Sequence, residues 1–106
     1  MTKSEVLYPK LKYFFSAYFH QDWKTMYDGD GKNASYKEVV KDFKANNPAA
    51  TVNQAIQELE SFLNQNLSEQ ELHKIVVHEL GANFRAAGAR LTYQQWLNSV
   101  LDILKT

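Results

Sequence analysis

A helix-capping signature recurs four times in this chain of 106 residues and constrains its fold more than any other feature. In each case a serine or threonine is followed three positions later by glutamate or glutamine, close to apolar residues at helical spacing. This is the pattern of the capping box, in which two side chains satisfy free backbone donors at the start of a helix. The sequence therefore predicts four helix starts, at Ser35/Glu38, Thr51/Gln54, Ser68/Glu71 and Thr92/Gln95.

A fifth helix is predicted to begin near Pro9, because the N–H that proline lacks would have no partner in a first helical turn. Pro48 and Gly81 predict helix ends, since the residue before a proline avoids helical dihedrals and glycine readily forms a left-handed cap. Residues 24–34 and 82–90 are expected to be loops, and no segment has a convincing strand pattern. We therefore expect an all-α fold, a single-domain compact bundle of about five or more helices over residues 1–106.

The segment YFFSAYFHQDW, residues 13–23, contains six aromatic side chains and closes on polar groups. His20 and Asp22 can be interpreted as a general acid–base pair, or as the polar end of a buried helix, where histidine interacts well with the helix dipole. Acid–base work needs a cleft and converging partners, which the sequence does not show. We therefore favour a structural motif and no catalytic residue; the motif comprises Tyr18, Phe19, His20, Gln21, Asp22, Trp23, Glu79 and Trp96.

Glu79 belongs to this motif because it falls on the apolar side of its predicted helix. An ionised carboxylate is costly there unless it is paired. We expect a donor such as His20, Trp23 or a tyrosine hydroxyl. The rival interpretation is a small hydrolase built on His20, Asp22 and Glu79.

Metal-binding patterns are incomplete. His78-Glu79 begins like the zinc motif HExxH, but the second histidine is missing, and His73 and His78 lie about 140° apart around an ideal α-helix. Asp28 and Asp30 resemble the start of a calcium loop that lacks its glycine turn and its final glutamate. The chain contains no cysteine. We expect neither a metal nor a cofactor.

The formal net charge of zero hides an uneven distribution. Residues 1–50 carry eight lysines against six acidic groups, residues 51–84 carry one basic group against five glutamates, and residues 85–106 carry three basic groups against one acidic. No basic face is available to release counterions from phosphates, so direct nucleic-acid binding is not expected. The acidic middle third favours a basic partner.

No stretch approaches the roughly 18 apolar residues of a membrane span, and the start MTKSEVLYPKLKYFF lacks a signal-peptide cleavage site. We therefore expect a cytoplasmic protein with no membrane partner. The absence of cysteine suits a reducing compartment.

Several motifs together resemble one protein family. Tyr8-Pro9-x-Leu11, Phe14-Phe15, the string YFHQDW at 18–23 and Leu91-Thr92-Tyr93-x-x-Trp96-Leu97 are similar to a family of small immunity proteins from bacterial contact-dependent growth inhibition systems. The stretches 42–48 and 56–63 fit the same pattern, so the resemblance covers most of the chain. It departs at 81–84, where the family carries a more aromatic, proline-containing turn.

The resemblance implies an α-helical, non-enzymatic protein of the cytosol that binds and blocks the toxic C-terminal domain of a cognate secreted effector. Such toxins are often nucleases, and we expect an RNase. Because a nuclease binds phosphates and tends to be basic, acidic groups are candidate docking residues, and exposed aromatic side chains are candidate anchors. The alternative is a helical adaptor that binds a protein without blocking it. The candidate toxin-binding residues are Asp28, Asp30, Glu58, Glu60, Glu69, Glu71, Tyr13 and Phe84.

Overall fold

The computed structural model describes residues 3–27 and 35–106, and every regular element in these ranges is a helix. The all-α prediction is therefore confirmed. The α-helices are α1 (Lys3–Leu7), α2 (Pro9–Tyr18), α3 (Trp23–Tyr27), α4 (Tyr36–Asn46), α5 (Ala49–Leu63), α6 (Glu69–His73) and α7 (Tyr93–Lys105), with a π-helical turn η1 (Lys74–Glu79) and a 3₁₀ turn η2 (Ala86–Ala89).

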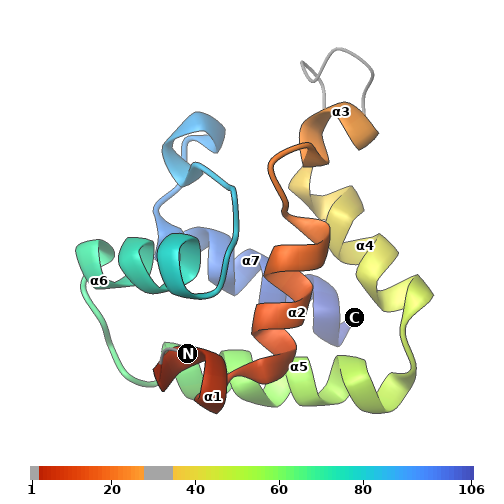
Figure 1. Cartoon of the computed structure of the whole chain (residues 1–106), viewed down its shortest axis with the longest axis horizontal. Coiled ribbons are helices and arrows are strands. Elements are labelled where there is room, and N and C mark those ends of the chain that lie inside the picture. Colours follow the sequence, from red (N-terminus) through yellow and green to blue (C-terminus); the bar gives the residue numbers. More distant parts are fainter. Residues whose placement is uncertain (1–2, 28–34) are drawn as a thin grey trace.

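Helix α2 runs through the middle of the molecule, against α5 and α4 (Figure 1). Helix α7 packs against α5, α4 and α6, so α2 and α7 share the interior. The segment from α6 to η2 forms one side of the molecule in this view, and α3 with α4 forms the other. The two sides are thus joined by the central helices.

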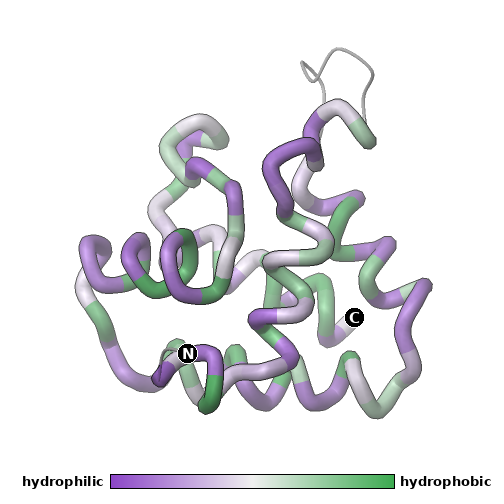
Figure 2. Tube along the Cα trace, in the orientation of Figure 1, coloured by the Kyte–Doolittle hydropathy of each residue, from purple (hydrophilic) through white to green (hydrophobic). Residues whose placement is uncertain are grey.

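Aromatic rings fill the space between these helices. Phe14 stacks on Phe43 with ring centres 4.2 Å apart, and Phe84 stacks on Trp96 at 4.3 Å. Such pairs add to the free energy gained by burying large apolar side chains. Figure 2 shows that hydrophobic and hydrophilic residues alternate within each long helix, as expected for helices with one buried face. The fully buried aromatic residues are Phe14, Phe15, Phe19, Phe43, Phe62 and Trp96.

Two of the four predicted capping boxes are confirmed. The Ser68 hydroxyl accepts from the Glu71 N–H at 3.2 Å, and the Glu71 carboxylate accepts from the Ser68 N–H at 3.3 Å. Thr92 and Gln95 make the same reciprocal pair at 3.0 and 2.9 Å. Helices α6 and α7 therefore begin where local sequence predicts.

The other two boxes are wrong in detail. Ser35 caps α4, but its hydroxyl accepts from the Lys37 N–H, while the Glu38 carboxylate lies 3.7 Å from the Lys41 ammonium. Helix α5 begins at Ala49, directly after Pro48, so Thr51 already lies inside it. Proline is well suited to the start of a helix, and here it sets the boundary ahead of the threonine.

The aromatic segment 13–23 does not end as one helix. Helix α2 ends at Tyr18, residues 19–22 make a bend, and α3 begins at Trp23. His20 and Asp22 therefore lie in a connection between two helices instead of in a last helical turn. Residues 24–27 belong to α3, so the predicted loop over 24–34 is also wrong at its start.

Gly81 ends η1 with a positive φ of 84°, as predicted for a left-handed cap. A Cβ added to Gly81 would lie 3.2 Å from the Ser16 Cβ, so α2 also restricts this position. The predicted loop over 82–90 is only partly correct, because it contains η2. The π-helical turn before Gly81 was not predicted.

Candidate functional site

His20, Asp22 and Glu79 do not converge on a shared centre. The His20 Nδ1 accepts a hydrogen bond from the Asp22 backbone N–H at 3.1 Å, which makes the imidazole part of the bend after α2. His20 lines a cavity together with Met26 and Asp42, while Asp22 is exposed and Glu79 belongs to η1. This arrangement lacks the geometry of a base held by a second carboxylate.

Glu79 is half-buried, but the Trp23 indole, one of its expected donors, serves another acceptor. The Trp23 indole N–H donates to the Asn83 carbonyl at 2.9 Å, and it is the backbone carbonyl of Glu79 that lies 3.4 Å from the Lys12 ammonium. Within residues 3–27 and 35–106, no group donates a hydrogen bond to the Glu79 carboxylate. The expectation of a buried partner is not met there.

Glu58 is a buried residue that stabilises the fold. It is 8% exposed, and its Oε1 accepts the backbone N–H groups of Lys10 and Leu11 at 2.9 and 3.1 Å. These are free donors in the first turn of α2, where a negative charge also interacts well with the helix dipole. Its Oε2 accepts from the Gln54 amide at 3.0 Å, so both oxygens have partners within the chain. The carboxylate thereby holds α2 onto α5.

Glu69, Glu71 and Glu60 remain at the surface. Glu69 is exposed, and its two oxygens accept the N–H groups of Tyr93 and Gln94 at the start of α7, at 2.8 and 3.0 Å. Glu71 is exposed within the Ser68 capping box. The Glu60 carboxylate lies 3.4 Å from the Lys105 ammonium, with 45% of its side chain exposed. All three can present charge to solvent.

The two aromatic candidates differ sharply in exposure. Tyr13 is 42% exposed and donates through its hydroxyl to the Asn47 side chain at 3.0 Å, so it is held in place at the surface. Phe84 is 5% exposed and stacks on Trp96, so it cannot reach a partner. Asp28 and Asp30 lie outside the described residues.

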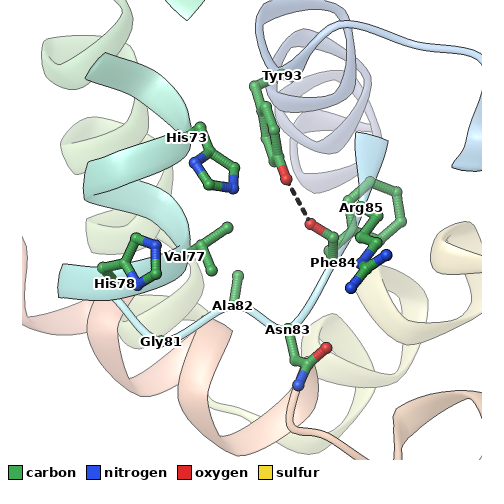
Figure 3. Close-up of a pocket in the computed structure, with 9 residues that line it drawn as sticks. All are labelled: His73, Val77, His78, Gly81, Ala82, Asn83, Phe84, Arg85 and Tyr93. Atoms are coloured by element: carbon green, nitrogen blue, oxygen red, sulfur yellow. Dashed lines mark hydrogen bonds between the residues drawn. The ribbon is translucent and has the colours of Figure 1, made fainter. Parts of the chain in front are cut away.

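A cleft of about 400 Å³ opens between η1, the following loop and α7 (Figure 3). Its loop wall is fastened from two sides, because Asn83 donates its N–H to the Phe19 carbonyl at 2.7 Å and the Tyr93 hydroxyl donates to the Phe84 carbonyl at 2.8 Å. Burial raises the pKa of the Tyr93 hydroxyl, and the nearby Glu69 charge raises it further. The lining residues are His73, Val77, His78, Gly81, Ala82, Asn83, Phe84, Arg85 and Tyr93.

The two histidines of this cleft lie closer together than the sequence predicts. Their ring centres are 5.5 Å apart, because the π-helical turn between them changes the angular spacing of an ordinary helix. The apolar spacing of this segment gives no sign of the wider turn. Across the described residues, no group of three or more His, Cys, Asp or Glu side chains is arranged to hold a metal ion.

The chain is thus a small all-helical protein in which several polar side chains, such as Glu58, Glu69 and Glu71, bind backbone N–H groups at helix starts. Residues 7–104 match the sequence model of the family described as CdiI immunity protein, and the chain belongs to this family. The predicted resemblance is thereby confirmed. No curated protein matches the chain.

The fold is similar to that of a chain in the crystal structure of a CdiA-CT/CdiI complex from Y. kristensenii 33638. The TM-score is 0.80 and the sequence identity is 22%, over 92% of this chain and 98% of that chain. At this identity the similarity shows a shared fold. None of the described helices is long and apolar enough to cross a bilayer.

Proposed function

We propose that this protein binds the toxic C-terminal domain of a cognate contact-dependent growth inhibition effector and neutralises it. The family match over residues 7–104 carries this proposal. Additional support comes from the fold shared with a chain of a CdiA-CT/CdiI complex. The protein acts in the cytoplasm, with residues 1–106 as one inhibitory domain.

Co-expression tests this function. The toxin domain encoded with this chain is expressed in bacteria with and without it. We expect growth arrest by the toxin alone, rescue by the chain, and co-purification of the two as a stable complex. Loss of growth despite folded, abundant immunity protein contradicts the proposal.

Neutralisation proceeds by occlusion of the toxin's active site or substrate groove, without chemistry by this chain. This mode is supported by the arrangement of His20, Asp22 and Glu79, which do not converge on one centre. His20→Gln keeps an acceptor for the Asp22 N–H while removing the imidazole. We expect it to leave protection unchanged, whereas loss of a measurable turnover by the folded variant indicates catalysis.

The toxin is a basic nuclease, and we propose an RNase. The surface carboxylates of Glu60, Glu69 and Glu71 then steer association, with the exposed Tyr13 ring as a further contact residue. Asp28 and Asp30 are also proposed to attract the toxin, because they carry the same negative charge. Glu58 and Phe84 are left out because both are buried.

Replacement of Glu60, Glu69 and Glu71 by glutamine tests the steering. Glutamine keeps one acceptor oxygen at each position while removing the charge, and circular dichroism checks that each variant is folded. We expect a slower association rate and a weaker salt dependence of toxin binding. The matched control replaces Glu38, Asp42 and Asp102, which are exposed elsewhere, by Gln, Asn and Asn. Equal association rates for both triple variants rule out the proposed docking groups.

A further inference from the structure

The π-helical turn η1 places His73 and His78 together. The Leu80 N–H donates to the Ile75 carbonyl at 2.7 Å, five residues back, instead of to the Val76 carbonyl. A π-turn holds about 4.4 residues, so positions five apart lie about 50° apart around the axis and not 140°. The two imidazoles are 5.5 Å apart between ring centres, at an interplanar angle of 83° (Figure 3).

This spacing fits two ligands of one metal ion. Zinc binds imidazole nitrogen at about 2.0–2.1 Å, and two imidazoles in a tetrahedral arrangement then have their ring centres roughly 5 Å apart. The observed separation is within reach of a small side-chain rotation. Both imidazoles are exposed and both line the cleft of about 400 Å³, so an ion can enter without unfolding the turn.

We propose that His73 and His78 bind a divalent transition metal ion, such as Zn²⁺ or Ni²⁺, across the π-turn. Neutral imidazole suits these ions, whereas Mg²⁺ and Ca²⁺ prefer oxygen ligands. With two protein ligands from the described residues, water fills the remaining positions, and the ion exchanges readily. Neither imidazole belongs to the toxin-docking residues proposed above, although the Glu69 carboxylate lies near both sites.

The charged side chains around the cleft influence the affinity of the proposed site for the metal ion. Arg85 lines the same cleft and repels a cation, while the Glu69 carboxylate at the start of α7 attracts it. Arg85→Gln removes the repulsion and leaves the two imidazoles in place. This variant is therefore expected to bind the ion several-fold more tightly than the wild type.

Calorimetric titration of the whole chain with Ni²⁺ and with Zn²⁺ tests the site. His73→Asn and His78→Asn should each weaken binding at least tenfold. The double variant should lose much less than a further tenfold, because one histidine alone already fails to hold the ion. The chain has three histidines, so His20→Gln is the matched control and should bind like the wild type.

NMR of the imidazole rings gives a second measurement that needs no substitution. Added Zn²⁺ should shift the His73 and His78 ring resonances together, at one stoichiometric equivalent, and leave those of His20 in place. Equal affinity of wild type and double variant, or shifts confined to His20, overturns the site.

Discussion

The aromatic interior and the cleft segment from η1 to η2 are stabilised in different ways. In the interior, rings of α2, α4 and α7 exclude water, and their contribution grows with the area they bury. In the cleft segment a few directed hydrogen bonds fasten the loop, such as Asn83 to Phe19 and Tyr93 to Phe84. The first region is sensitive to lost volume, and the second is sensitive to changed backbone geometry.

The largest effect is expected in the interior. Phe14→Ala removes a ring that is fully buried and stacked on Phe43, so the free energy of unfolding should fall by about 3–5 kcal/mol. Urea denaturation followed by circular dichroism measures the change. Met26→Ala is the control, because Met26 is 68% exposed and should lose less than about 0.5 kcal/mol. Similar losses for both variants contradict the packing argument.

A smaller effect is expected where α2 and α5 meet. Glu58→Ala leaves the N–H groups of Lys10 and Leu11 without their acceptor, and should cost about 2–3 kcal/mol. Glu58→Gln retains an acceptor oxygen and should cost about 1 kcal/mol. Thermal unfolding of the two variants distinguishes the lost hydrogen bonds from the lost charge. A Gln variant as unstable as the Ala variant assigns the effect to charge.

Backbone geometry is tested at two glycines on opposite sides of the cleft loop. Gly81→Ala places a Cβ at a φ of 84° and 3.2 Å from the Ser16 Cβ, so a loss of about 1–2 kcal/mol is expected. Gly88→Ala meets no atom within 4 Å and should be neutral or slightly stabilising. Equal stability of the two variants, measured by urea denaturation, argues against backbone strain at Gly81.

The smallest expected effect is on the free energy of unfolding at alkaline pH, through Tyr93 at the cleft. Because burial raises the pKa of Tyr93 above 10.0, the folded protein holds this proton more tightly than the unfolded chain does. The resulting stability is present below pH 10 and is lost as pH rises through the folded-state pKa. Tyr93→Phe should flatten the fall of unfolding free energy above pH 10. An unchanged slope contradicts the assignment.

Local signals predicted much of this fold. The Ser68/Glu71 and Thr92/Gln95 boxes are correct because each pair involves neighbouring residues only. Thr51/Gln54 fails because Pro48 starts the helix earlier and Gln54 donates to Glu58, whose position depends on α2, nearly 50 residues away in sequence. A capping pattern therefore predicts a boundary only where no tertiary contact competes for its side chains.

The candidate site was less predictable for the same reason. Phe84 is in a polar segment, and its burial depends on the Trp96 ring stacked on it. The approach of His73 and His78 depends on one wider helical turn, which a period of 3.6 residues does not reveal. Exposure of Tyr13, by contrast, follows from its place opposite the apolar face of α2.

The hydrogen bonds that hold the backbone of residues 83 and 84 also affect the entropy cost of binding at the cleft. Their backbone is tied to Phe19, Trp23 and Tyr93 before any ligand arrives. A surface that is already ordered loses little conformational entropy when it is covered, so more of the contact energy is retained as affinity. A ligand of the cleft therefore meets a rim whose backbone needs little rearrangement before it is covered.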